Sequence, residues 1–236
     1  MGGICFPFLF TLGYIVYIVI EKEKTMNTID NFDLLANLLP LHSSDPDEFW
    51  IVRIIKRKKD DPNLEKNSKS LKLYHVKDRE ELLAMKDKIV KYAEEHNARA
   101  YFNPNPKSWK KVAIQAMKEL ANIIEQEDYQ RSWRVIDKVI DSGCNYGSDK
   151  IWVIDLDDFT PKEIEGIIKL IRHIYRSYNT YSVLDPIIEK VPTIHGWHLL
   201  TRPFNVDDFK KCDWPEKLCP EIKKNNPTLL YYGANI

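Results

Sequence analysis

The sequence predicts a mixed α/β protein of the α+β class, and three observations lead to this prediction. Apolar runs of strand length recur along the chain, they alternate with amphipathic stretches of helical period, and the last strands follow one another closely enough to pair antiparallel. The chain has 236 residues, of which 44% are hydrophobic and 30% charged, as is typical of a folded globular protein. Its formal net charge is zero, so the overall charge gives no argument for a polyanionic partner.

The first unit of the protein is expected to occupy about residues 48–140. A short helix is predicted within 27–41, and strands are predicted at 48–56 and 70–76. The polar stretch between these strands contains Asp-Pro-Asn, which indicates a hairpin loop. Asp78 is a favourable N-cap for the amphipathic helix that follows.

Asn-Pro pairs and glycines divide the middle of the chain. The strand at 98–106 is expected to end in two Asn-Pro pairs, because a residue before proline avoids helical backbone angles. Helices are predicted at about 108–126 and 129–140, and the glycine-containing stretch 141–149 follows them. A second unit then extends from about 150 to 236.

The second unit opens with the segment "KIWVIDLDDFT", residues 150–160. Thr160 and Pro161 favour a helix start directly after it. Three short strands are predicted downstream, within "YSVLDPIIEKV", "WHLLTRPF" and "PTLLYY".

Carboxylates lie at the end of the apolar strand "IWVI". Alternate residues of a strand share a face, so Asp155 and Asp157 point the same way, with α-carbons about 7 Å apart. Two such carboxylates repel each other unless a cation lies between them, and oxygen ligands of this kind suit Mg²⁺ or Mn²⁺. The alternative is that the strand ends there in solvent, with Asp158 or Thr160 capping the next helix.

The cysteines and the N-terminus bear on the compartment. The spacing of Cys5, Cys144, Cys212 and Cys219 fits no zinc pattern, and scattered thiols indicate a reducing compartment. Residues 4–20 are uncharged and apolar, so segment 1–25 is either a short membrane anchor or the product of a misassigned start, with translation beginning at Met26. The second interpretation is favoured because the chain after Met26 has the composition of a soluble, cytoplasmic protein.

A second motif, "TIHGWHLLTRPF", places Gly196 and His198 at the start of a strand. "VIDLDD" followed by "HGWHLL" resembles the catalytic core of archaeo-eukaryotic primases and primase-polymerases, in which a D-x-D or D-x-E strand precedes a small-Gly-x-His segment and a third acid. His195 replaces the small residue of that pattern. Upstream, "RAYFNPNPKSW" is similar to the strand ending in Asn-Pro that phage and plasmid members carry before the catalytic strand.

The resemblance implies a single domain over 26–236: a primase-like core with an RRM-like antiparallel sheet packed by helices, and an N-terminal α/β unit. It implies a template-dependent nucleotidyltransferase that uses nucleoside triphosphates, a single-stranded nucleic-acid template and Mg²⁺ or Mn²⁺, with a helicase or other replication proteins as possible partners. The third acid would be Glu221, with Asp207 and Asp208 as rivals.

The resemblance also assigns roles to individual residues. The implied metal ligands are Asp155, Asp157 and Glu221, and His198 would contact the triphosphate. Arg202 lies an even number of residues from His198 and is expected to add a phosphate contact. The expected contacts to nucleic acid come from a basic cluster around Trp109, formed by Lys107, Lys110 and Lys111.

Two other interpretations compete with the polymerase. The fold could be retained by a catalytically inactive nucleic-acid-binding or replication-accessory protein, particularly if Glu221 is not a metal ligand. "DLDDFT" also resembles the D-x-D-x-T/V loop of haloacid-dehalogenase-like phosphatases, although Phe159 stands where Thr or Val is expected and Thr160 comes one place late.

Overall fold

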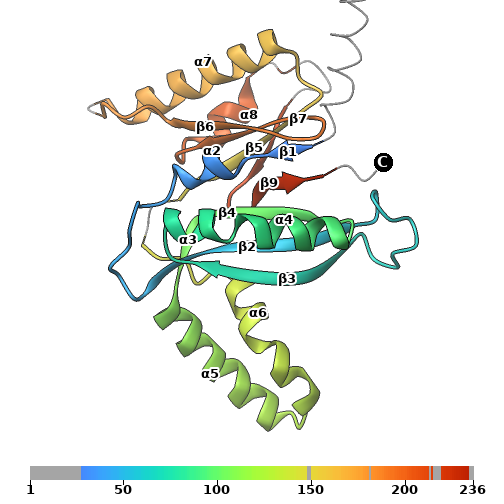
Figure 1. Cartoon of the computed structure of the whole chain (residues 1–236). Coiled ribbons are helices and arrows are strands. Elements are labelled where there is room, and N and C mark those ends of the chain that lie inside the picture. Colours follow the sequence, from blue (N-terminus) through green and yellow to red (C-terminus); the bar gives the residue numbers. More distant parts are fainter. Residues whose placement is uncertain (1–27, 148–149, 181, 213, 215–218, 234–236) are drawn as a thin grey trace, which may run out of the picture.

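The computed structural model describes residues 28–147, 150–180, 182–212, 214 and 219–233. In this part of the chain two antiparallel sheets and their helices form the α+β arrangement that the sequence predicts. Sheet A contains, in order across the sheet, β1 (Ile29–Asp30), β9 (Thr228–Tyr232), β4 (Arg99–Ser108), β2 (Glu48–Arg57) and β3 (Ser68–Val76). Sheet B contains, in order, β6 (Ile187–Pro192), β7 (Gly196–Thr201), β5 (Trp152–Asp157) and β8 (Glu221–Lys223). Sheet B lies above sheet A in Figure 1.

The predicted hairpin of β2 and β3 is present, and β4 pairs with the other edge of β2. The expectation that β4 ends at its Asn-Pro pairs is wrong, because the strand continues to Ser108. Extended backbone is what a residue before proline prefers, so Asn-Pro is compatible with a strand. The register between β2 and β4 shifts between Phe49 and Ile51, where the partner strand carries prolines that cannot donate a ladder hydrogen bond.

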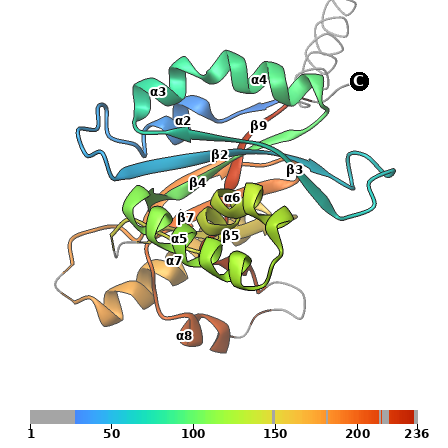
Figure 2. The same cartoon turned by 90° about the horizontal axis from the view of Figure 1, so that it is seen from below.

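The two faces of sheet A are covered by different helices. On one face, Val52 and Ile54 belong to a core shared with α2 (Phe32–Ala36), α3 (Arg79–Ala84) and α4 (Lys86–Glu95). On the other face, Phe49 and Ile51 pack against a helical hairpin formed by α5 (Trp109–Glu125), the 3-10 helix η1 (Tyr129–Arg134) and α6 (Val135–Asp141). Figure 2 shows this hairpin on the side of sheet A away from α3 and α4.

Several predicted helices differ in detail from the observed ones. The single helix expected after Asp78 is divided at Met85, although Asp78 caps it as predicted by accepting from the Glu81 amide. The stretch expected to be one helix at 129–140 begins as the 3-10 turn η1. Within 27–41, the short helix α2 is preceded by the edge strand β1.

Sheet B has a β-α-β-β-α-β connection, with α7 (Pro161–Tyr178) after β5 and α8 (Val206–Lys211) after β7. Thr160 and Glu163 form a capping box at the start of α7, which confirms Thr160 as the helix cap. Asp158 does not cap this helix; its φ is +65° and its amide donates to the carbonyl of His195. The side chains of Ile154 and Leu156 pack under α7, so Asp155 and Asp157 face away from it.

The two sheets share one core. Val153, Val191 and Leu200 of sheet B are buried in the same cluster as Val52 of sheet A. The buried amide of Asn31 donates to the carbonyls of Pro192 (3.0 Å) and Leu229 (2.9 Å), and so connects edge strand β6 of sheet B to strand β9 of sheet A.

None of the helices that the structure describes is long and apolar enough to cross a membrane. The apolar segment 4–20, on which the prediction of a membrane anchor depends, lies outside the described residues.

Candidate functional site

The strand register of sheet B brings the predicted acids and histidine together. Asp155 on β5 lies opposite His198 on β7 and opposite Glu221 on β8. Directly opposed residues of antiparallel neighbours project from the same face, so these three side chains share a face with Asp157. This is the face of sheet B that α7 does not cover.

Gly196 is required by the close approach of β7 to β5. Gly196 lies opposite Asp157, and a Cβ atom on it would stand 2.4 Å from the Leu156 carbonyl oxygen and 2.9 Å from the Asp157 α-carbon. A larger residue would push the strands apart. The glycine of the predicted motif therefore has a steric role in holding Asp157 at this position.

Asp155 is the electrostatic centre of the site. Lys223 donates to its Oδ2 at 2.6 Å, whereas its Oδ1 is buried, has no hydrogen-bond partner among the described residues, and lies 4.0 Å from Nε2 of His198. Burial acts to raise the pKa of Asp155, but the hydrogen bond and charge of Lys223, with a smaller contribution from His198, outweigh it and the pKa is lowered. Asp155 is therefore a carboxylate at neutral pH.

His198 is held in place by a residue of sheet A. Its Nδ1 is 2.8 Å from the hydroxyl of Thr228 on β9, which leaves Nε2 directed toward Asp155. Burial lowers the pKa of His198, and the nearby carboxylate of Asp155 only partly opposes this effect. The imidazole is consequently neutral at neutral pH and can act as a hydrogen-bond donor or acceptor without carrying charge.

The predicted third ligand, Glu221, is near the acids but directed to solvent. Its side chain is 70% exposed and its carboxylate lies 3.3 Å from Lys223, so one ammonium bridges Glu221 and Asp155. The rivals Asp207 and Asp208 lie in the first turn of α8, as their sequence predicted, and do not line the cavity of the site.

The residues fit a divalent cation only with help from other ligands. No group of three or more Asp, Glu, His or Cys side chains in the described ranges is placed to hold a metal ion. Mg²⁺ commonly takes one or two carboxylates and completes its shell with water and substrate phosphates. Asp155 and Asp157 offer that number of carboxylates, and the unpartnered Oδ1 of Asp155 offers a buried lone pair.

A cavity of about 190 Å³ lies between the acidic face of sheet B and sheet A. Sheet A and its β2–β3 loop contribute three basic side chains to it, Arg57, Lys59 and Arg99. Burial lowers the pKa of Lys59, and the neighbouring charges of Arg99 and Arg57 lower it further, which shows how closely the cations are grouped. Arg99 is held in place by Asp60, whose carboxylate accepts from its Nε at 2.7 Å.

The structure does not bring the other predicted nucleic-acid contacts to this cavity. Lys107 is buried, and its ammonium donates to the Gly143 carbonyl (3.0 Å) and to the Asn145 side chain (2.8 Å). Lys111 donates to the Asn145 carbonyl at 2.7 Å, so both lysines fix the loop before β5. Lys110 is exposed on α5, and Arg202 follows the end of β7; neither lines the cavity.

Trp109 is neither fully buried nor placed in the site. Its ring stacks on Phe49 with centroids 3.8 Å apart, and 37% of the residue remains exposed.

Sequence reasoning missed most of the basic side of the cavity. Arg57 and Lys59 belong to a visible basic run, "RIIKRKK", but the run itself does not indicate what it faces. Arg99, Tyr101 and Thr193 carry no local signal, because only the packing of sheet A against sheet B places them here. Thr193 donates to Oδ1 of Asp157 at 3.0 Å and so orients the second acid.

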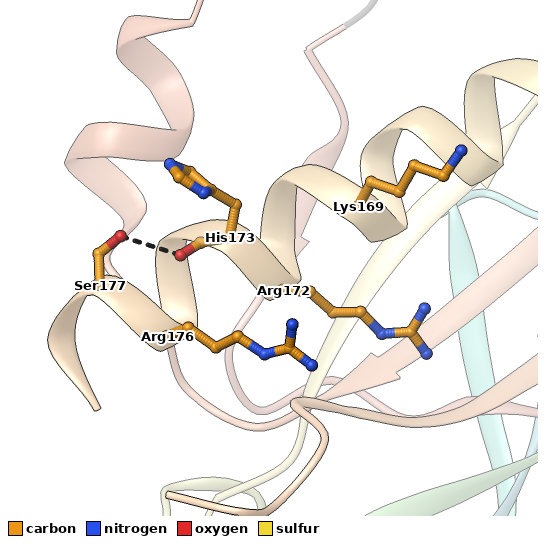
Figure 3. Close-up of a pocket in the computed structure, with 5 residues that line it drawn as sticks. All are labelled: Lys169, Arg172, His173, Arg176 and Ser177. Atoms are coloured by element: carbon orange, nitrogen blue, oxygen red, sulfur yellow. Dashed lines mark hydrogen bonds between the residues drawn. The ribbon is translucent and has the colours of Figure 1, made fainter. Parts of the chain in front are cut away.

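A separate hollow of about 460 Å³ lies along α7 (Figure 3). Lys169, Arg172 and Arg176 line it, but Arg172 is paired with Asp185 and all the lining residues come from one helix. This helix packs on the opposite face of sheet B from Asp155, so the hollow is not part of the acidic site.

The chain was compared with known proteins, and no protein-family model, curated protein or solved structure matches it.

Proposed function

We propose that this chain is a template-dependent nucleotidyltransferase of the primase-polymerase type, which forms phosphodiester bonds from nucleoside triphosphates. The observation that carries the proposal is one cavity with two unlike walls. Asp155, Asp157 and His198 line one wall, and a group of cations from sheet A and its loop lines the other. Carboxylates suit a divalent cation, and closely grouped cations suit a polyphosphate.

The topology of sheet B supports the same proposal. The primase resemblance implies an RRM-like antiparallel sheet packed by helices, next to an N-terminal α/β unit. The β-α-β-β-α-β connection and the strand order β6-β7-β5-β8 agree with such a sheet. The same topology serves many functions, so the argument for catalysis depends on the residues of the site.

The residues would divide the reaction between them. Asp155 and Asp157 would hold Mg²⁺ or Mn²⁺, which when bound supplies charge stabilisation at the reacting phosphate. Neutral His198 would offer Nε2 to the triphosphate, and Arg57, Lys59 and Arg99 would offset the charge on the β- and γ-phosphates. The 3′-hydroxyl of the growing strand would lose its proton to water as its oxygen forms a bond to the α-phosphorus, and the bond to the departing pyrophosphate would break.

The decisive experiment supplies a primed and an unprimed template, labelled nucleotides, and Mg²⁺ or Mn²⁺. We expect product from the wild type and a loss of at least 100-fold in the Asp155→Asn/Asp157→Asn variant. Asp158→Asn is the matched control, since Asp158 belongs to the same acidic run, does not line the cavity, and has a left-handed backbone that asparagine tolerates. Absence of product from the wild type, or equal product from the double variant, would refute the catalytic assignment.

One observation favours the second candidate, a catalytically inactive nucleic-acid-binding protein. The ammonium of Lys223 bridges Asp155 and Glu221, and so already offsets the charge of Asp155, one of the two carboxylates that would hold the metal. A wild type that binds oligonucleotides without extending them would support this candidate. The phosphatase interpretation gains no such support, because Thr160, the hydroxyl residue that follows the acidic run in the sequence, is engaged in the cap of α7.

A further inference from the structure

Three adjoining cavities form a groove that leads from the candidate site along sheet A to the helical hairpin. The cavity at Asp155 shares Ile55 and Tyr101 with a second cavity of about 220 Å³. The second shares Arg53 and Asp141 with a third of about 970 Å³, which reaches η1 and α6. We call this row of cavities the sheet A groove; the Arg53–Asp141 ion pair lies where the second and third cavities meet.

The far part of the sheet A groove carries an excess of positive charge. Six basic residues line the largest cavity against three acidic ones: Arg53, Lys66, Lys69, Lys72, Arg134 and Lys138, against Glu65, Asp137 and Asp141. Lys69 and Lys72 lie opposite Lys56 and Ile54, so their side chains project from the other face of sheet A, where the Lys72 ammonium contacts the Tyr92 ring of α4. Arg53 is paired with Asp141, and Lys138 with Glu119. Lys66, Lys69 and Arg134 make no ion pair within the described part of the chain.

An exposed aromatic ring stands beside these cations. Trp133 of η1 lines the largest cavity and is 73% exposed, although burying a tryptophan is normally favourable. The guanidinium of Arg134 lies 4.1 Å from the centroid of its ring. An open aromatic face among cations is how proteins bind unpaired bases, because stacking on the ring and phosphate contacts act together. The serines and charged residues around Leu64, Leu71 and Leu73 favour a polyanion over a nonpolar peptide.

We propose that the sheet A groove binds single-stranded nucleic acid, with a base on Trp133 and phosphates at Lys66 and Arg134, and guides the strand toward Asp155. The role of this strand as a template rests on the proposed function, whereas its binding does not. Trp133, Lys66 and Arg134 do not belong to the basic cluster around Trp109. Lys107 of that cluster lines the second cavity, but its ammonium is occupied in fixing a loop, as is that of Lys111.

The stacking contact is tested by fluorescence anisotropy of a fluorescein-labelled oligothymidylate, without metal or nucleotide. We expect Trp133→Ala to weaken binding by about 5- to 150-fold, the effect of losing one stacked base. Tyr129→Ala is the control, because Tyr129 is an exposed aromatic of the same 3-10 helix that does not line the groove. Equal affinities of wild type and Trp133→Ala would overturn the stacking role.

The phosphate contacts are tested by charge reversal in the same assay. We expect Lys66→Glu/Arg134→Glu to weaken binding at least tenfold and to reduce the slope of log affinity against log salt by about 1.4, the value for two phosphate contacts. Lys162→Glu/Lys210→Glu changes the net charge equally on α7 and α8, outside the groove, and should leave the affinity within about threefold. An equal effect of both double variants would refute the assignment of the groove.

Binding and synthesis fail separately in these experiments. If the wild type binds oligothymidylate through Trp133, Lys66 and Arg134 but extends no primer, the binding role of the groove is supported and the proposed catalytic function is refuted. If the wild type synthesises product while Trp133→Ala and Lys66→Glu/Arg134→Glu bind as tightly as wild type, the binding role of the groove is refuted and the catalytic function is supported. Circular dichroism of each variant confirms that it is folded, as the exposure of all three side chains leads us to expect.

Discussion

At the scale of the residue, Lys223 determines the electrostatic state of Asp155. Its ammonium contacts Asp155 at 2.6 Å and Glu221 at 3.3 Å, and thus occupies the position from which a divalent cation would bind both acids. A protein cation and a metal ion compete for the same lone pairs. The balance between the catalytic and the inactive candidate therefore depends on how readily Lys223 can be displaced.

We expect Lys223→Met to tighten Mn²⁺ binding at least tenfold, because the competing charge is removed while the aliphatic stem is kept. Electron paramagnetic resonance of free Mn²⁺ gives the dissociation constant directly. Lys224→Met is the control, since the Lys224 ammonium lies 5.0 Å from the ring of Trp152 and does not line the cavity. An unchanged constant in Lys223→Met would show that the two cations do not compete.

His198 makes stability depend on pH in a predictable direction. Burial lowers its pKa below the value of about 6.5 that an unfolded chain shows, so the unfolded state binds more protons as the pH falls. The contribution to stability is present above pH 6.5 and is lost as the pH falls toward the folded pKa. His75, whose pKa burial also lowers, acts in the same sense.

His198→Gln should therefore reduce the loss of unfolding free energy between pH 7.5 and 5.5, as measured by urea titration. Part of the pH dependence should remain because His75 is unchanged. His173→Gln, on the exposed side of α7, should retain the wild-type dependence. The same pH dependence in His198→Gln and wild type would contradict the burial argument.

At the scale of the element, the β5–β7 pair depends on a missing side chain. We expect Gly196→Ala to cost about 1–3 kcal/mol of stability, because its Cβ would press on backbone atoms of Leu156 and Asp157 that cannot rotate away. Thermal unfolding by circular dichroism measures the effect. Gly166→Ala, in the middle of α7 with open space around the added carbon, should instead be stabilising by about 0.5–1 kcal/mol.

A stable Gly196→Ala variant would mean that β7 can shift away from β5. Such a shift would also move Asp157. This variant should therefore lose primer-extension activity even if its unfolding temperature stays close to that of the wild type.

At the scale of the whole molecule, the two sheets should unfold together. Their shared core includes Leu200 and Val153 of sheet B with Val52 and Phe102 of sheet A, all fully buried. Leu200→Ala is expected to reduce the free energy of unfolding by about 2–5 kcal/mol and to lower the unfolding temperature of both sheets equally. Coincident transitions by far-ultraviolet circular dichroism and tryptophan fluorescence would agree with this, whereas two separate transitions would contradict a single cooperative unit.

The acidic wall could be predicted from the sequence, but the basic wall could not. Asp155 and Asp157 follow an apolar strand, and strand alternation alone places them on one face. Arg99 and Tyr101 sit on β4, and nothing near them in the chain indicates which sheet they will face. Long-range packing decides such contacts.

The prediction that Lys107 contacts nucleic acid is wrong for a related reason. A lysine is almost never fully buried unless it is paired, so Lys107 was predicted to be available to nucleic acid. Its burial depends on the carbonyl of Gly143 and the side chain of Asn145, which lie in a loop of no regular pattern. Trp133, in contrast, lies in a stretch predicted as plain helix, and its exposure became visible only once η1 and α6 were placed.

The chain passes from β8 to β9 through residues 224–227, and so leaves one sheet and enters the other in a few steps. Five peptide units separate Lys223 from Thr228, which limits the distance between those α-carbons to at most about 18 Å. At this end the acidic and basic walls are thus joined by a short connection. Residues of this connection also line the first and second cavities of the groove, so a movement that separates the two walls would change both cavities at once.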